Sequence, residues 1–148
     1  MNILAVDDDK AMTELIAMLL QKHGFVVRTS NSARDAIRLI SENWAHAVVL
    51  DLMMPDMDGR QVCKKVREFS DVPIIILSAF NNPDVVAESL DSGADDYLVK
   101  PVPSEVLAAH ITRLIRRTGK LVLNSERLAP NAWIPSSASI PTTPVKST

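Results

Sequence analysis

The feature that most constrains the fold is a regular alternation of short apolar runs with longer amphipathic stretches. Apolar runs of strand length occur at residues 3–6, 25–27, 47–50, 74–77 and 97–99. Runs that are apolar on both faces are typical of strands inside a parallel sheet, because helices cover both sides of such a sheet.

The stretches between these runs have apolar residues at helical spacing. They predict helices at residues 11–23, 32–42, 59–68, 83–92 and 104–117. The first would face inward with Leu15, Ile16, Leu19 and Leu20, and Gly24 would stop it. Strands that alternate with helices, joined by right-handed crossovers, predict an α/β fold of the flavodoxin-like (βα)5 type. Its doubly wound parallel sheet would have the strand order 2-1-3-4-5.

Composition narrows the class of protein. The net charge is −2, so we expect no direct binding of nucleic acid by this chain. No apolar run approaches the roughly 18 residues of a membrane helix, and the N-terminus does not resemble a signal peptide, so we expect no membrane association. The single cysteine, Cys63, agrees with a cytoplasmic location. Residues 1–118 are predicted to form the domain, and residues 119–148 a disordered tail or linker remnant rich in Pro, Ser and Thr.

Polar residues follow four of the predicted strands at the point where each strand ends. They are the run Asp7-Asp8-Asp9, then Asp51, Ser78 and Lys100. Ligand sites of doubly wound sheets lie beyond the carboxyl ends of the strands, so these groups should meet at one edge. Taken alone, each has an ordinary explanation, and Asp9 could simply cap the following helix. Their coincidence at one sheet edge favours a chemical site.

The motifs around these residues resemble a known family. The pair Asp7-Asp8, the segment 51–59 (DLMMPDMDG), Ser78-Ala79 and Lys100-Pro101 are similar to the receiver domain of bacterial response regulators. Residues 93–101 (GADDYLVKP) resemble the OmpR/PhoB-like branch, and the resemblance covers residues 2 to about 117. It implies that Asp51 accepts a phosphoryl group from the phosphohistidine of a sensor histidine kinase or a phosphotransfer protein. The chain would thus be no enzyme beyond catalysing its own phosphorylation and dephosphorylation.

The resemblance also implies a Mg²⁺ cofactor. Asp8, Asp51 and the backbone carbonyl of Met53 would bind the ion directly, and Asp7 mainly through a water molecule. Mg²⁺ prefers oxygen ligands and takes only one or two carboxylates, which suits this set. A cation is needed because the nucleophile and the phosphoryl group are both anionic.

Three further roles follow from the resemblance. Lys100 would pair with Asp51 at rest and with a phosphoryl oxygen after transfer, and its bond to Pro101 would be cis. Ser78 would donate its hydroxyl to another phosphoryl oxygen. Tyr97 would rotate as Ser78 moves and change the surface of the fourth helix, fifth strand and fifth helix; its ordinary explanation is a half-buried strand aromatic.

Several positions depart from the family pattern. Phe80 stands where a polar or basic residue is usual, and Glu88 where the family usually has arginine. The acidic residues Asp95 and Asp96 and the basic residues Arg113, Arg116 and Arg117 keep part of the set through which the branch dimerises. We therefore expect at most a weak homodimer. His46 is interpreted as a surface residue at a strand edge. His23 and His110 fall on predicted helices without partner carboxylates at metal-site spacing, so all three histidines are interpreted as structural.

Two other classes of function remain open at this stage. A phosphatase of the haloacid-dehalogenase type also uses an Asp nucleophile with Mg²⁺, and Asp7 and Asp9 have its spacing. That class gives no role to the motif around Asp51. A degenerate receiver that acts only as a binding module would need no intact acceptor site. Only 31 residues, 118–148, follow the last predicted helix, so a winged-helix DNA-binding domain is not expected in this chain.

Overall fold

The computed structural model describes residues 1–127, 142–143 and 145–146. Within residues 1–127, strands and helices alternate in the predicted order. The strands are β1 (Asn2–Val6), β2 (Val26–Ser30), β3 (Ala47–Leu50), β4 (Ile74–Ser78) and β5 (Asp96–Val99). The helices are α1 (Lys10–Gln21), α2 (Ala33–Ser41), α3 (Gly59–Val66), α4 (Pro83–Asp91) and α5 (Ser104–Arg127).

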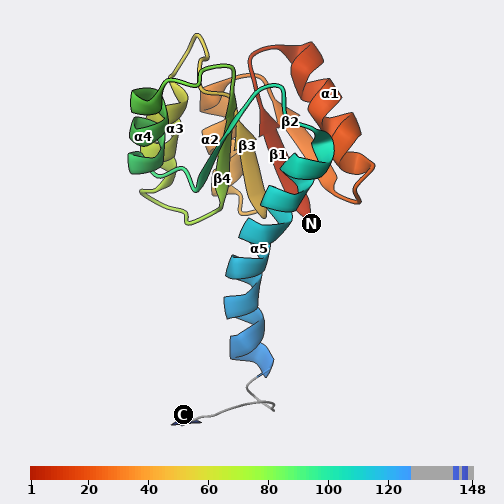
Figure 1. Ribbon diagram of the computed structural model, residues 1–148, viewed down its shortest axis with the longest axis vertical. Coiled ribbons are helices and arrows are strands. Elements are labelled where there is room, and N and C mark those ends of the chain that lie inside the picture. Colours follow the sequence, from red (N-terminus) through yellow and green to blue (C-terminus); the bar gives the residue numbers. More distant parts are fainter. Residues whose placement is uncertain (128–141, 144, 147–148) are drawn as a thin grey trace. The chain divides into compact units, whose positions relative to one another are not determined.

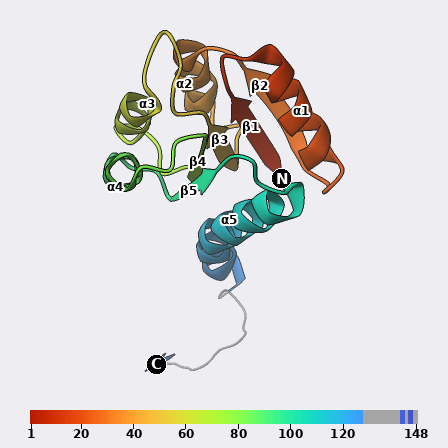
Figure 2. The same ribbon diagram turned by 45° about the horizontal axis from the view of Figure 1, so that its top comes forward.

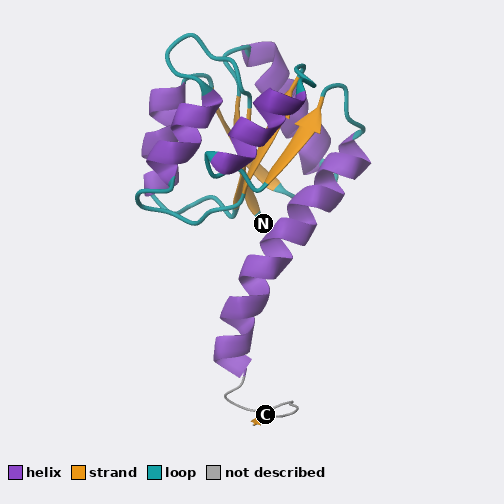
Figure 3. Ribbon diagram, turned by 60° about the vertical axis from the view of Figure 1, so that its left-hand side comes forward, coloured by secondary structure: helices purple, strands orange, loops and turns teal. Residues whose placement is uncertain are grey.

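The five strands form one parallel sheet in the order β2-β1-β3-β4-β5, which confirms the predicted topology. Figures 1 and 3 show the helices flanking these strands. Helices α2, α3 and α4 lie together on one side of the sheet, and α1 lies on the other (Figure 2). The sheet is therefore covered on both faces, as its apolar strands require.

The core lies along the three central strands. Every residue of β3 and β4 is buried, and so are residues 3–6 of β1. On the side of α2 and α3, the helices contribute Ala36, Ile40, Val62 and Val66 to the same buried cluster. Burial of this apolar surface is the main force that holds the sheet, and so its carboxyl edge, in place.

Side-chain caps fix where the helices begin. Asp9 accepts hydrogen bonds from two N–H groups at the start of α1, and Ser32 accepts one from α2. Asp58 and Gln61 form a reciprocal capping box on α3, and Asn82 caps α4. Each cap satisfies N–H groups that would otherwise lack a partner. The alternative reading of Asp9 as a helix cap is thus correct.

The inward face of α1 differs from the prediction. Ile16 and Leu20 are buried as expected, but Leu15 is 44% exposed and Thr13 is buried in its place. Thr13 can be buried because its hydroxyl donates to the backbone carbonyl of Lys10. Hydrophobicity alone assigned the wrong residue to the core at this position.

The last helix is longer than predicted. It was expected to end at Arg117 but continues to Arg127, since Gly119 lowers helix propensity without preventing a helix. The chain divides into two compact units, Met1–Leu114 and Ile115–Thr148, and α5 crosses their boundary. In the second unit, β6 (Thr142–Thr143) and β7 (Val145–Lys146) form a short antiparallel pair. The rest of the predicted tail lies outside the described residues.

Candidate functional site

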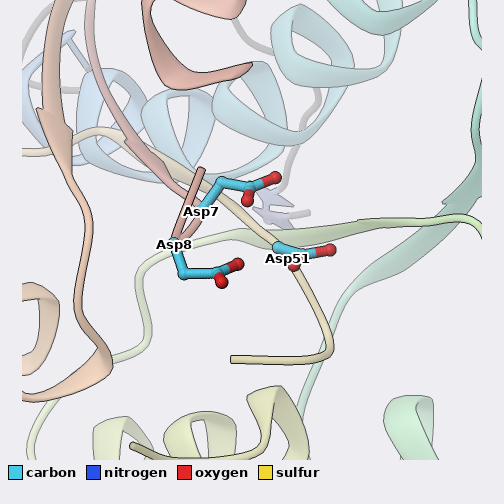
Figure 4. Close-up of side chains that lie close together, drawn as sticks. All are labelled: Asp7, Asp8 and Asp51. Carbon is cyan, nitrogen blue, oxygen red and sulfur yellow. The ribbon is translucent and has the colours of Figure 1, made fainter. Parts of the chain in front are cut away.

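Three carboxylates gather at the carboxyl edge of the central strands. Val6 of β1 pairs with Leu50 of β3, so the residues that follow, Asp7 and Asp51, emerge side by side. Carboxylate oxygens of Asp7, Asp8 and Asp51 all lie within 4.8 Å of one another. Figure 4 shows the three carboxylates turned toward a common space. Parallel pairing in register is what brings residues 44 positions apart in sequence into one site.

Asp7 is the buried member of this group and is held from several directions. Its backbone N–H donates to the Ser30 carbonyl, and its Oδ1 accepts a hydrogen bond from the N–H of Asp9. Its Oδ2 accepts a hydrogen bond from Nζ of Lys100 at 3.2 Å. Asp8, in contrast, is exposed. The two neighbouring acids therefore have different roles, one anchored in the fold and one open to solvent.

Lys100 lies between Asp7 and Asp51. Its Nζ is 3.5 Å from Oδ1 of Asp51, slightly farther than from Asp7. The predicted resting pair of Lys100 with Asp51 is therefore shared with Asp7, because Asp7 reaches into the same space from β1. The peptide bond between Lys100 and Pro101 is cis.

Asp51 has an unusual electrostatic environment. Burial, reinforced by the negative charge of Asp7, raises the pKa of the Asp51 carboxyl above its ordinary value, and the nearby ammonium of Lys100 only partly offsets this effect. The Asp51 side chain is nevertheless 14% exposed. Too little positive charge lies nearby to offset the burial of this carboxylate, yet solvent can still reach it. Such a group can bind a cation or react with an electrophile.

Ser78 and Tyr97 are linked through the backbone of Phe80. The hydroxyl of Ser78 accepts a hydrogen bond from the N–H of Phe80 at 3.1 Å. The hydroxyl of Tyr97 donates to the carbonyl of Phe80 at 2.7 Å. Ser78 is buried at the end of β4, whereas the Phe80 side chain is 49% exposed. A movement of Ser78 would therefore be transmitted directly to the segment that Tyr97 holds.

The loop between β3 and α3 is fixed by contacts that the sequence did not reveal. The N–H of Gly59 donates to the Leu52 carbonyl at 2.7 Å. Both carboxylate oxygens of Asp56 accept hydrogen bonds at the start of α2, from the N–H groups of Ala33 and Arg34. No sequence motif signals the cap that Asp56 provides, because its partners lie 22 and 23 residues away. These contacts hold the segment that contains Met53.

Residues 3–112 match the family of the response regulator receiver domain. The chain belongs to this family. Response regulator MprA of Mycobacterium leprae (strain TN) is 42% identical over 119 residues, which cover 80% of this chain and 52% of the relative. Transcriptional regulatory protein AfsQ1 of Streptomyces coelicolor is 40% identical over 116 residues, covering 78% and 52%.

Solved structures agree with the sequence relatives. The BeF3-activated N-terminal receiver domain of RstA from Klebsiella pneumoniae is similar with a TM-score of 0.75 and 32% identity, covering 78% of this chain and 99% of that one. A two-component response regulator from Clostridium difficile has a TM-score of 0.75 and 31% identity, covering 79% and 97%. These matches place the chain among the response regulator receiver domains of two-component systems.

The extent of the match is also informative. The chain spans about half the length of the curated relatives it matches.

Receiver domains are regulatory proteins rather than enzymes of the ordinary kind, and they interact with histidine kinases. Within the part of the chain that the structure describes, no helix is both long and apolar enough to span a bilayer.

Three of the charged residues considered for dimerisation, Asp95, Asp96 and Arg113, form pairs within the domain. Asp95 accepts hydrogen bonds from Arg67 and from the N–H of Ile74. Asp96 contacts Arg113 and His110. Strand β5 brings Asp96 beside α5, so His110 has a carboxylate partner that its spacing in the sequence did not reveal.

Glu88 and His46 also have partners in the fold. Glu88 of α4, which stands where the family usually has arginine, pairs with Arg60 of α3. The ring of His46 accepts a hydrogen bond from the N–H of Asn2, which agrees with its structural interpretation.

The first prediction concerns the charge of Asp51. Because its pKa is raised in the fold, its ionised form destabilises the native state, and stability is lost as pH rises through the folded pKa. Asp51→Asn should therefore raise the free energy of unfolding at pH 7 without Mg²⁺, because it removes a charge that burial and the neighbouring Asp7 disfavour. Urea titrations should show this gain shrinking as the pH is lowered toward 4. A variant that is less stable than the parent at pH 7 would contradict the claim that burial and Asp7 disfavour the ionised Asp51.

Proposed function

We propose that this receiver domain accepts a phosphoryl group on Asp51 in a Mg²⁺-dependent reaction. The observation that carries the proposal is the convergence of three carboxylates with Lys100, whose Nζ lies 3.5 Å from Asp51 and 3.2 Å from Asp7. The donor would be the phosphohistidine of a sensor kinase or phosphotransfer protein. The domain would act in the cytoplasm through its phosphorylated state.

The residues present fit a magnesium ion. Carboxylate oxygens on Asp8 and Asp51 and the backbone carbonyl of Met53 would hold it, with Asp7 acting mainly through water. The ion would screen the negative charges of the nucleophile and the phosphoryl group. The raised pKa of Asp51 supports this assignment, because such a carboxylate gains most from a nearby cation.

The chain's own residues perform the remaining work. An oxygen of Asp51 forms a bond to phosphorus as the bond between phosphorus and the donor's histidine nitrogen breaks, and the imidazole keeps the electron pair. Lys100 is already within reach of Asp51 and would pair with a phosphoryl oxygen. Ser78 would turn its hydroxyl hydrogen toward another oxygen of the phosphoryl group. Slow hydrolysis of the acyl phosphate would then reset the domain.

The switch would run from Ser78 through Phe80 to Tyr97. Drawing Ser78 toward the phosphoryl group would disturb its contact with the N–H of Phe80, whose carbonyl Tyr97 holds. The surface of α4, β5 and the first turns of α5 would then change shape, as in a two-state element biased by local charge.

Assembly through this surface would be weak. Asp95, Asp96 and Glu88 already have partners within the chain, and exposed ion pairs are each worth only about 0–1 kcal/mol. A homodimer would have to exchange these internal pairs for pairs between copies. We therefore propose a monomer at rest and at most a weak, salt-sensitive dimer when phosphorylated.

The phosphatase alternative is disfavoured by the position of Asp9. Its Oδ1 accepts hydrogen bonds from the N–H groups of Ala11 and Met12, so it serves as a helix cap. The binding-module alternative is disfavoured because Asp7, Asp8, Asp51, Ser78 and Lys100 all follow or end strands at one sheet edge, and a module that only binds would not need this full set.

The second prediction tests the proposed reaction on the intact chain. Incubation with acetyl phosphate and Mg²⁺ should add one phosphoryl group per chain, as measured by intact-protein mass spectrometry. Replacing Mg²⁺ with EDTA should prevent the addition, because the clustered carboxylates would then repel the phosphoryl donor. Equal phosphorylation in EDTA would contradict the role of the metal, and no phosphorylation in either buffer would favour a module that only binds.

A further inference from the structure

Asn31 stands immediately after β2, next to the acidic turn that follows β1. Its Nδ2 donates one hydrogen bond to the backbone carbonyl of Asp7 at 2.8 Å and one to Oγ1 of Thr13 at 3.1 Å. An amide nitrogen has two hydrogens, so both bonds can exist at once. Neither partner lies near Asn31 in sequence, and the residue belongs to no motif noted above.

The carbonyl that Asn31 binds belongs to the peptide unit between Asp7 and Asp8. The next N–H that is fixed belongs to Asp9 and donates to Oδ1 of Asp7. Asp8 thus lies between two anchored points of the backbone. Its own side chain is exposed and makes no hydrogen bond among those of the described residues. The direction in which Asp8 points is therefore set by its backbone, and Asn31 holds one side of it.

The hydrogen bond to Thr13 connects Asn31 to a buried residue of α1. Thr13 is 1% exposed, and its hydroxyl donates to the carbonyl of Lys10 while accepting from Asn31. A hydroxyl that is both donor and acceptor fixes the position of the group that it accepts from. The amide of Asn31 thus connects the end of β2, the acidic turn and α1.

Local helix capping does not explain Asn31. Ser32 caps α2 through the N–H of Asp35, and Asp56 accepts from the first N–H groups of that helix. Asn31 instead satisfies the carbonyl of Asp7, a residue that is 4% exposed. A buried carbonyl that loses its partner is strongly disfavoured, so the turn would rearrange without this amide.

We propose that Asn31 is a positioning residue for the metal site, which it serves by fixing the peptide between Asp7 and Asp8. The proposal rests on the proposed function, in which Asp8 and Asp51 hold Mg²⁺. It assigns to Asn31 no contact with the ion. The role is that of an outer support, which in metal sites affects affinity through the orientation of the ligands.

The third prediction tests this role by calorimetric titration of the full chain with MgCl₂. Asn31→Ala should raise the dissociation constant for Mg²⁺ roughly tenfold, the lower end of the effect of outer-shell partners. Asn31→Leu, which nearly keeps the side-chain volume but removes both donors, should do the same. Ser32→Ala is the matched control, because it removes a cap one residue away that does not contact the acidic turn. It should lower the urea midpoint but leave Mg²⁺ affinity at the value of the parent.

Comparison of the parent with Asp51→Asn distinguishes a failure of the proposed function from a failure of the proposed role of Asn31. If the parent binds no Mg²⁺, or binds it no more tightly than Asp51→Asn does, the proposed function itself fails. If the parent binds Mg²⁺ more tightly than Asp51→Asn and Asn31→Ala binds it as well as the parent, only the role of Asn31 is overturned. A weakened Asn31→Ala beside an unaffected Asn31→Leu would also overturn it, because packing rather than the amide donors would then be responsible.

Discussion

Replacing Asp51 with asparagine is expected to abolish the uptake of a phosphoryl group from acetyl phosphate. Asparagine keeps the size of the side chain but lacks the anionic oxygen that attacks phosphorus. The other two acids of the site do not replace Asp51. Asp7 is buried and holds Lys100, and Asp8 lies at the open side, away from the ammonium contacts that the structure records for the described residues. Intact-protein mass spectrometry after incubation with Mg²⁺ and acetyl phosphate measures this loss.

A matched control distinguishes the acceptor from any nearby carboxylate. Asp56→Asn removes a carboxylate from the same loop, where its oxygens contact the start of α2 rather than the acidic cluster. This variant should still gain one phosphoryl group. If Asp51→Asn is phosphorylated as fully as the parent, the acceptor lies elsewhere.

Gly59→Ala is expected to be among the most damaging single changes near the site. A Cβ at this position would lie 2.9 Å from the carbonyl oxygen of Asp51 and 3.0 Å from Cα of Leu52. Both atoms belong to the backbone, which cannot swing aside as a side chain can. The substitution should cost about 3 kcal/mol of unfolding free energy, the upper end of the range for overpacking. Urea denaturation measures this cost, and Mg²⁺ binding should weaken as the Asp51 backbone shifts.

Gly24→Ala provides the comparison for that experiment. Gly24 has a φ of +89° after α1, but nothing lies within 4 Å of a Cβ built there. Its replacement should cost only about 1–2 kcal/mol, the penalty for a left-handed backbone in a residue with a Cβ. Equal losses in the two variants would show that close approach to Asp51 is not what demands glycine at position 59.

The fold was predictable because its determinants are local and periodic. Strand β3 and residues 74–77 of β4 are runs of apolar residues in the sequence, and both strands are buried throughout in the structure. Gly24 has a positive φ after α1, as its position after an amphipathic stretch predicted. Where the signal was weak, the prediction failed. The end of α5 has no strong stop signal. In α1, Thr13 is buried and Leu15 is exposed, because a local hydrogen bond satisfies the threonine hydroxyl and makes its burial possible.

The acids, hydroxyl and ammonium of the candidate site were predictable for a topological reason. Residues at the carboxyl ends of parallel strands lie at one edge of the sheet, so the sequence alone predicts that Asp7, Asp51, Ser78 and Lys100 lie at the same edge. Their detailed pairing could not be predicted. Whether Lys100 lies nearer to Asp7 or to Asp51 depends on differences of a few tenths of an ångström.

The supporting contacts left no trace in the sequence pattern. Asn31 binds the carbonyl of a residue 24 positions away, and Arg60 meets Glu88 at a separation of 28. Such pairs depend on which loops the fold places side by side, and neither spacing nor hydrophobicity encodes that. The residues that support the site were thus harder to predict from the sequence than the residues that form it.

The most direct test of the account is the chemical identity of the phosphorylated residue. The chain should be phosphorylated with acetyl phosphate and Mg²⁺, treated with borohydride, digested and sequenced by mass spectrometry. Borohydride reduces an acyl phosphate on aspartate to homoserine, which marks the acceptor permanently. We predict homoserine at position 51 and unmodified aspartate at positions 7 and 8. Homoserine at position 7 or 8, or a stable phosphate on a serine or histidine with position 51 unmodified, would contradict the account.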